Sequence, residues 1–160
     1  MMADELNTHL NAYGVVCGLQ YERYFRKELV YEKAAVLPLF RTYPDAEIAW
    51  SGPWIIQLDA APGYRDQLLE LAQKCPSVTW IKSENDIDLL AAHLAQQLNV
   101  RLEDGRIALF RFYDPRVLHR VKDILAPPQR EEMLQGIAEW RYTLAGNDYA
   151  IHVNAKGLAS

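Results

Sequence analysis

Cysteine is scarce in this chain. Only Cys17 and Cys75 occur among its 160 residues, far apart and without the close pairing of zinc sites or redox motifs. A disulfide framework would need more cysteines in a small secreted domain. We therefore expect two reduced thiols in the core of a cytosolic protein, because free cysteine is among the most buried residue types.

Long hydrophobic runs are missing as well. A membrane-spanning helix needs about 20 consecutive apolar residues, and no stretch of the chain approaches that length. The first residues, MMADEL, do not show a basic region followed by an apolar one, so no secretory signal is recognisable. We expect a cytoplasmic protein without a membrane partner.

Charge of one sign is not in large excess. The 17 basic and 21 acidic residues give a formal charge of −4, and no basic tract interleaves with aromatic residues. This balance argues against nucleic acid as a partner. With 50% hydrophobic and 24% charged residues, the chain has the composition of one ordinary globular domain, which we place at 1–160.

Motifs that carry chemistry are also missing. Gly14 and Gly18 lack the spacing and the following helix of a nucleotide-binding loop. No two histidines stand at the helical spacing of a metal site, and no Gly-x-Ser-x-Gly turn is present. We therefore expect a protein without catalytic residues, cofactor or metal.

One catalytic alternative stays open. A nucleophile at Cys17 or Ser83 could act with His93 or His119 as its base, while Asp114 orients the ring. That arrangement needs three distant elements to meet, and no local pattern favours it. Each histidine is otherwise expected to be a surface or boundary residue of its helix.

The hydrophobic pattern alternates between strands and helices. We expect an α/β fold of one domain, with a mixed β-sheet, helices packed on its faces and a C-terminal β-hairpin. The expected strands cover 13–19, 54–58, 78–81 and 99–103, the expected helices cover 4–11, 21–33, 64–75, 83–98 and 129–139, and the hairpin covers 141–153.

The stretch 106–118 organises the rest of the chain. Its first eight residues are apolar or aromatic apart from the arginines, which is typical of a central, buried strand. Asp104 and Gly105 before it favour a tight hairpin turn. Asp114 is expected to cap a helix over 116–125, with Pro115 in its first turn.

Arg111 is the polar exception within this expected strand. A guanidinium buried on a strand face needs a carboxylate partner, because an unpaired buried charge is very costly. We expect Arg111 to pair with Asp114, which is nearest in sequence, or with Asp59 or Asp86.

The run from Leu109 to Leu118, LFRFYDPRVL, closely resembles the signature of a bacterial family first catalogued as a domain of unknown function. Its members are the effector adaptors, or chaperones, of the type VI secretion system. Gly52, Pro53 and Trp54 begin a segment, GPWII, that resembles the Gly-Pro-Trp-Leu-Val strand of this family. The resemblance covers about 13–140, and its signature residues are Arg111, Asp114, Pro115, Arg116, Gly52, Pro53 and Trp54.

The chain departs from the family pattern in two places. Many members have an acidic residue after the first strand, where this chain has Cys17 and Gly18. Many also carry a sizeable C-terminal extension, whereas this chain ends at Ser160. If that extension helps to hold the effector in relatives, we expect this protein to bind its cargo with the α/β domain alone.

The resemblance implies an adaptor that binds a type VI secretion effector in the cytoplasm. It would help to load the effector onto the valine-glycine repeat spike protein, without turnover and without a cofactor. Two alternatives from other classes are a small hydrolase that uses Ser83, His93 and Asp114, and an immunity protein, which would also be small and acidic.

An adaptor needs a surface for its cargo, and such surfaces are rich in aromatic residues and arginine. The segment 21–43 is the best local match, and its ragged periodicity implies that some of its rings are exposed. The residues expected to bind a partner are Tyr21, Tyr24, Phe25, Tyr31, Phe40 and Tyr43.

Overall fold

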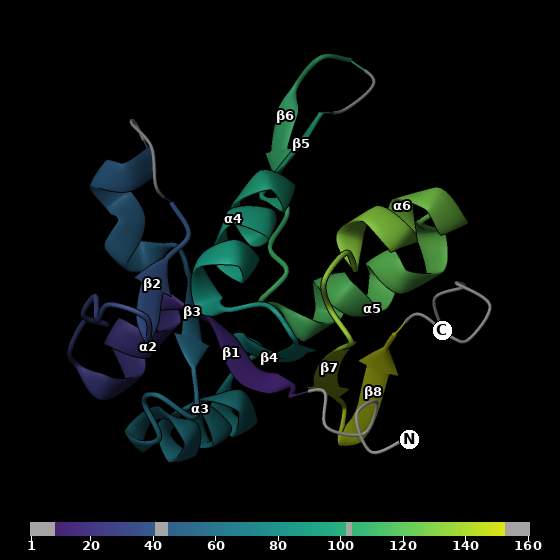
Figure 1. Ribbon diagram of the computed structural model, residues 1–160. Helices are drawn as coiled ribbons and strands as arrows, with labels where there is room; N and C mark the ends of the chain where they lie inside the picture. The colour runs from purple at the N-terminus through teal and green to yellow at the C-terminus, as the bar shows by residue number, and fades with distance from the viewer. Residues whose placement is uncertain (1–8, 41–44, 102–103, 153–160) are drawn as a thin grey trace, which may run out of the picture.

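The computed structural model describes residues 9–40, 45–101 and 104–152 (Figure 1). Most of the helix expected at 4–11 lies outside these residues, and so does Tyr43.

A six-stranded antiparallel sheet runs through the molecule in the order β2-β3-β1-β4-β7-β8 (Figure 1). Its strands are β1 (Asn11–Cys17), β2 (Val36–Pro38), β3 (Pro53–Gln57), β4 (Val78–Ser83), β7 (Glu139–Leu144) and β8 (Asn147–Ile151). All its strand pairs are antiparallel, whereas a mixed sheet was expected. The α/β class, the single domain and the C-terminal hairpin are confirmed.

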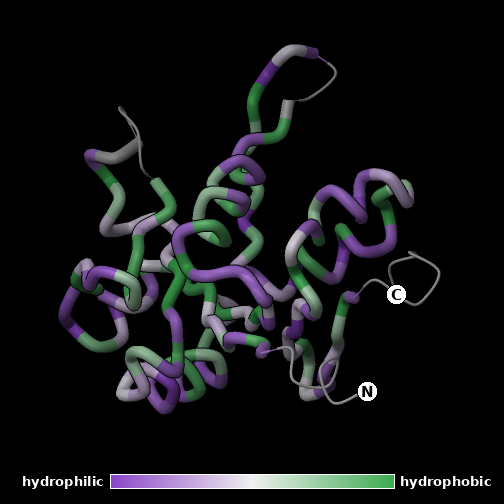
Figure 2. The backbone as a smooth tube through the Cα atoms, in the orientation of Figure 1, coloured by the Kyte–Doolittle hydropathy of each residue, from purple (hydrophilic) through white to green (hydrophobic). Residues whose placement is uncertain are grey.

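The central strand β1 is buried on both faces. Val15 lies opposite Ile55 of β3 and Thr79 of β4, and these side chains share one face of the sheet. The next residue, Val16, belongs to the other face and lies opposite Trp54. Hydrophobic colour accordingly follows the central strands in Figure 2, which explains why their sequences read as nearly continuous apolar runs.

Helices cover the two faces of the sheet (Figure 1). On one face, α4 (Ile87–Gln97), α5 (Pro115–Ile124) and α6 (Pro127–Met133) belong to a core that includes Val15, Ile55 and Trp140. On the other face, α2 (Gly18–Phe25) and α3 (Gly63–Lys74) pack in a core that includes Val16 and Ile56. None of the described helices is long and apolar enough to cross a bilayer.

Helix ends account for two differences from the expected ranges. Asp86 caps α4 by accepting a hydrogen bond from the Leu89 N–H at 2.9 Å, so this helix begins after Ser83 and Asn85. Arg26 has a φ of 61° and closes α2 by donating to the Glu22 carbonyl. The helix expected at 21–33 therefore begins earlier, at Gly18, and ends at Phe25.

The expectation of a central strand at 106–113 is wrong. β5 (Asn99–Arg101) and β6 (Ile107–Leu109) form a separate two-stranded hairpin that projects from the body (Figure 1). Ile107 is 61% exposed, and 110–113 contains no strand. The apolar run is divided between a projecting hairpin and a segment that sends Phe112 into the core. A continuous apolar pattern does not distinguish this arrangement from a buried strand.

Both predicted hairpins exist. The connection between β5 and β6 contains Asp104 and Gly105, whose φ is 88°, but it is longer than the expected two-residue turn, because Arg101 pairs with Ile107. The β7–β8 hairpin turns through Ala145 and Gly146, both at positive φ, which is the backbone that a two-residue turn between twisted strands requires. Helix α6 is shorter than the expected 129–139, because the chain turns at Gly136, whose φ is 76°, before it enters β7.

Candidate functional site

A cleft of about 440 Å³ lies at one end of the sheet. Its walls come from the end of β1 and the start of α2, the start of β3, the end of α3 and the segment before α5. We call it the signature cleft, because five of the seven signature residues line it, namely Gly52, Pro53, Arg111, Asp114 and Arg116. Two sequence segments that resemble the adaptor family thus meet at one place.

One wall is a closely packed backbone corner. The Gly18 N–H donates a hydrogen bond to the Gly52 carbonyl at 2.8 Å, and a Cβ at Gly18 would overlap the Trp50 carbonyl oxygen. A Cβ at Gly52 would come within 2.6 Å of the Phe40 ring. Trp54 holds the same corner by donating from Nε1 to the Ala49 carbonyl at 3.0 Å. The wall therefore leaves no room for side chains at these glycines.

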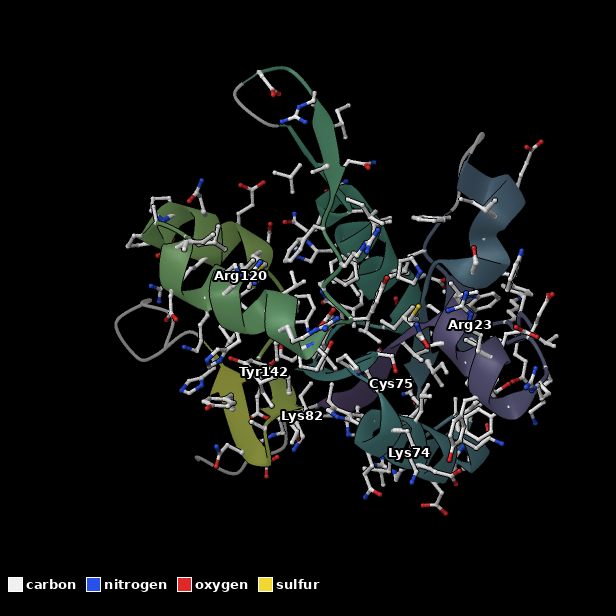
Figure 3. All side chains as sticks on the ribbon, turned by 180° about the vertical axis from the view of Figure 1, so that it is seen from behind. Arg23, Lys74, Cys75, Lys82, Arg120 and Tyr142 are labelled. Carbon is white, nitrogen blue, oxygen red and sulfur yellow. The ribbon has the colours of Figure 1, made fainter. Side chains whose placement is uncertain are left out.

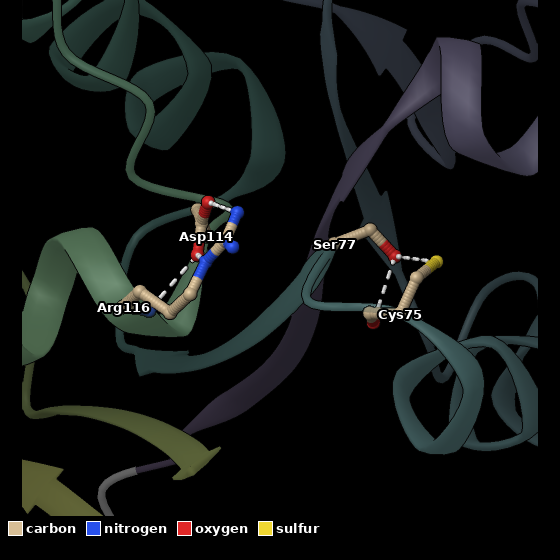
Figure 4. A network of polar contacts seen from close by, with 4 residues as sticks. All are labelled: Cys75, Ser77, Asp114 and Arg116. Carbon is tan, nitrogen blue, oxygen red and sulfur yellow. Dashed lines mark hydrogen bonds and ion pairs between the residues drawn. The ribbon is translucent and has the colours of Figure 1, made fainter.

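The opposite wall begins at Asp114. Its Oδ1 accepts a hydrogen bond from the Arg116 N–H at 2.9 Å, and Pro115 is the first residue of α5, so the predicted cap is confirmed. The same carboxylate accepts from the Arg116 side chain, at 3.1 Å from Nε and 2.8 Å from Nη2 (Figure 4). Asp114 is only 7% exposed, and this fork neutralises its charge.

A buried hydrogen-bond chain ties the signature segment to the sheet. Thr79 Oγ1 on β4 donates to the Phe112 carbonyl at 3.0 Å, and it accepts from Trp140 Nε1 on β7 at 2.9 Å. The Phe112 ring packs against Trp140 with a centroid distance of 5.6 Å. This anchor determines where the next residues, including Asp114, leave the core.

The buried ion pair expected for Arg111 is wrong. Arg111 is exposed, and within the described chain no ion pair joins it to a carboxylate. Asp114 pairs with Arg116 instead, Asp86 caps α4, and Asp59 is exposed. The expectation failed because it placed Arg111 on a buried strand, whereas its segment crosses the open end of the sheet.

Two thiols and a phenol complete the floor of the cleft. Burial, together with a hydrogen bond to Cys17, raises the pKa of the half-buried Tyr113, and the charge of Arg111 opposes that shift. The Cys75 Sγ lies 3.3 Å from Ser77 Oγ (Figure 4). Both cysteines are free; Cys17 is buried, as expected, whereas Cys75 is only partly buried and is not a core residue. The sequence singled out Cys17, as a departure from the family pattern and as a candidate nucleophile, and Tyr113 lies within the signature run, but no sequence signal placed Cys75 beside them.

The residues of the catalytic alternative bond to other groups. Ser83 Oγ donates to the Gly136 carbonyl, His93 Nε2 bonds to the Met133 carbonyl at 2.9 Å, and His119 Nδ1 bonds to the Tyr142 hydroxyl at 2.8 Å. None of these hydrogen bonds joins a candidate nucleophile to a candidate base. In the part of the chain that the structure describes, no group of three or more His, Cys, Asp or Glu is placed to hold a metal ion.

The aromatic residues expected to bind a partner separate into buried and exposed ones. Tyr21 is 1% and Phe40 is 9% exposed, Phe25 is half-buried, and Tyr24 and Tyr31 are 38% and 58% exposed. Phe40 lines the signature cleft, whereas Tyr21 packs on Phe25 at 4.7 Å. The exposed part of the expected surface is therefore limited, among the residues described, to Tyr24 and Tyr31 with the partly accessible Phe25.

The structure shows a second exposed apolar surface, which the sequence did not predict. Val100, Ile107 and Leu109 of the β5–β6 hairpin are 44%, 61% and 38% exposed, and hydrophobic colour marks this hairpin in Figure 2. Beside it, Ile124 at the end of α5 is 69% exposed. A groove of about 440 Å³ that includes Val100 and Ile124 separates the hairpin from α5 and α6. Val100 pairs with Ala108 and lines this groove, whereas Ile107 and Leu109 lie on the opposite face of the hairpin, and Leu109 lines the signature cleft. Exposed apolar residues that line a groove are typical of an interaction surface.

A family model described as "Domain of unknown function (DUF4123)" matches residues 12–132. The chain belongs to this family. The match begins in β1 and ends in α6, so it includes the whole signature cleft and the projecting hairpin. No curated protein and no solved structure matches the chain.

Proposed function

We propose that this protein is a cytoplasmic adaptor, or chaperone, that binds a type VI secretion effector. It helps to load the effector onto the valine-glycine repeat spike protein and acts by binding, without catalysis or cofactor. Membership of the family and the resemblance of its signature to that of these adaptors support the proposal.

The observation that carries the proposal is the convergence of the signature on one cleft. Gly52 and Pro53 lie far from Arg111, Asp114 and Arg116 in sequence, yet all of them line the same cavity. The glycines and the Asp114 cap shape the walls, while Arg111 and Arg116 reach solvent. Such a rigid frame with exposed cations suits recognition of another molecule.

An adaptor that joins an effector to a spike needs two surfaces. The signature cleft offers one, with polar and charged groups at its mouth. The β5–β6 hairpin and its groove offer another, which is mostly apolar. A two-stranded hairpin is only marginally stable on its own, so a partner that covers its exposed apolar side chains would stabilise it.

Co-expression tests this function. The tagged chain is produced with candidate effectors and the spike protein of the same cell, and the complexes are separated by size-exclusion chromatography. We expect the chain to co-purify with one effector and with the spike, and we expect effector export to stop when the chain is deleted. A chain that binds the effector, neutralises its toxicity and never contacts the spike would instead be an immunity protein.

Val100→Ser and Ile124→Ser, at two residues that line the groove and lie outside the signature cleft, separate the two surfaces in this assay. Both side chains are exposed, so the melting temperature should change little. We expect the double variant to lose one of the two partners and to keep the other. Retention of both partners would show that the groove is not a binding surface.

A further inference from the structure

The charges of the signature cleft do not balance. Arg111 and Arg116 are its cationic lining residues, and Asp114 is the one carboxylate among its described lining residues. Asp114 already accepts three hydrogen bonds from Arg116, two of them from the guanidinium. Arg111 therefore leaves a positive charge at the cleft without an ion-pair partner among the described residues.

The guanidinium of Arg111 is suited to one kind of ligand group. It is planar, it carries several N–H donors, and its geometry matches a carboxylate in a bidentate pair. Its neighbours in the cleft include apolar side chains, namely Leu19, Phe40 and Leu109. A complementary ligand would combine a carboxylate with an adjoining apolar group.

We propose that the signature cleft receives an aspartate or glutamate side chain from an extended segment of the effector, and that Arg111 pairs with its carboxylate. This inference rests on the adaptor function proposed above. The apolar residue next to the acid in the effector packs against Phe40 and Leu109. The cleft volume of about 440 Å³ accommodates a few side chains and excludes a folded domain.

The exposure of Arg111 favours a polypeptide ligand over a free small anion. A single ion pair in contact with water contributes little free energy, typically below about 1 kcal/mol. A free small anion would therefore bind weakly here. An effector segment adds apolar burial and backbone contacts, which supply the affinity, while the ion pair supplies the preference for an acidic side chain.

The test uses an array of short peptides in matched pairs. Each acidic peptide places Asp or Glu beside an apolar residue, and its partner carries Asn or Gln at the same position. We expect the wild-type protein to bind acidic members and to bind their amide partners up to about fivefold more weakly, the range for an ion pair in contact with water. Equal binding of both members, or binding of neither, would overturn the proposal.

Arg111→Gln removes the positive charge, so it should bind acidic peptides only as weakly as it binds their amide partners. Arg111→Lys keeps the positive charge but loses the two-pronged guanidinium geometry. Its affinity for acidic peptides should therefore lie between that of the wild type and that of Arg111→Gln. Arg120→Gln is the matched control: Arg120 is exposed on α5 outside the cleft (Figure 3), and this variant should bind like the wild type. Arg111→Gln that binds acidic peptides normally would contradict the proposal.

Co-purification separates this inference from the adaptor function. If the effector co-purifies equally with the wild type and with Arg111→Gln, the adaptor function stands and the acidic site is wrong. If no effector co-purifies with the wild type, the adaptor function itself fails. The melting temperature of Arg111→Gln should equal that of the wild type, because Arg111 is exposed.

Discussion

The indole Nε1 of Trp140 donates a hydrogen bond to the Oγ1 of Thr79 at 2.9 Å, between two fully buried side chains. Because the same oxygen donates to the Phe112 carbonyl, one hydroxyl joins β4, β7 and the signature segment. A buried polar group of this kind stabilises a fold only while all its partners are present.

Thr79→Val tests this junction. Valine keeps the shape of threonine but leaves both the Trp140 N–H and the Phe112 carbonyl without the hydroxyl. At about 1–3 kcal/mol for each unsatisfied group, the free energy of unfolding should fall by about 2–6 kcal/mol in denaturant titrations. Thr79→Ser should recover most of that loss. Thr143→Val is the control, because Thr143 is exposed on β7 and should change stability by less than about 0.5 kcal/mol.

Asp114→Ala removes a helix cap and an ion pair together. The Arg116 side chain is 63% exposed, so the variant leaves a solvated cation, not a buried one. We therefore expect the cost of a lost cap, about 0.5–2 kcal/mol, below the 3–5 kcal/mol of a broken buried pair. Asp114→Asn, which keeps an accepting oxygen, should cost less. A loss above about 3 kcal/mol in thermal unfolding would contradict this interpretation.

Gly52→Ala tests the packed corner of the cleft. The added Cβ would lie 2.6 Å from Phe40 ring atoms, so the ring or the backbone must move. We expect a loss of about 1–3 kcal/mol in the free energy of unfolding. Gly63→Ala is the matched control, because a Cβ at this first residue of α3 meets nothing within 4 Å and should stabilise the helix slightly. Equal stability of the two variants would show that the corner is not tight.

Tyr24→Ser combined with Tyr31→Ser tests the aromatic segment as a partner surface. Both rings are exposed, and the Tyr24 hydroxyl bonds to Glu70 at the surface, so the melting temperature should stay nearly unchanged. We expect co-purification of the effector or the spike to be lost. Normal binding by the double variant would place the interface elsewhere, and a large drop in melting temperature would show that these rings stabilise the fold.

Alkaline pH should destabilise the protein between about pH 10 and 12. Burial raises the pKa of Tyr13, Tyr21 and Tyr142 from 10.0 to about 12. In this range the unfolded chain releases phenolic protons that the folded chain keeps, so deprotonation favours unfolding. Each tyrosine should lower the free energy of unfolding by up to about 1.4 kcal/mol per pH unit.

Denaturant titrations along a pH series measure this slope, and phenolate absorbance follows the titration itself. Tyr21→Phe should make the slope shallower, because one of the tyrosines with a raised pKa is then missing. The stability contribution of these groups is fully present below pH 10. A constant free energy of unfolding from pH 10 to 12 would contradict the raised pKa values.

Local sequence patterns predicted the features whose physical causes are local. The apolar repeat that includes Leu68 and Leu71 gave α3 nearly its observed bounds, because a helix buries residues three and four apart on one side. Asp114 before Pro115 predicted the start of α5, and Asp104 with Gly105 predicted the hairpin turn. Caps and turns depend on neighbouring backbone groups, so a few residues specify them.

The same patterns failed where contacts between residues far apart in sequence determine the structure. The apolar run at 106–113 is equally compatible with a central strand and with a projecting hairpin followed by an anchored segment. The strands β3, β1 and β4 pair with one another at the centre of the sheet, so this run has no central position to occupy. Phe112 is instead held in the core by the hydrogen bond from Thr79 to its carbonyl and by ring packing on Trp140. Arg111 therefore reached the open end of the sheet, where no buried partner is needed.

By itself, the sequence determined the α/β class, most of the helices and strands, and the family signature. Only the tertiary structure decided that Cys17, Gly52, Cys75 and Arg111 share one cleft. These residues sit at the ends of different elements, and strand order and register set which ends meet. Those depend on cooperative packing across both faces of the sheet, which no local stretch of sequence encodes.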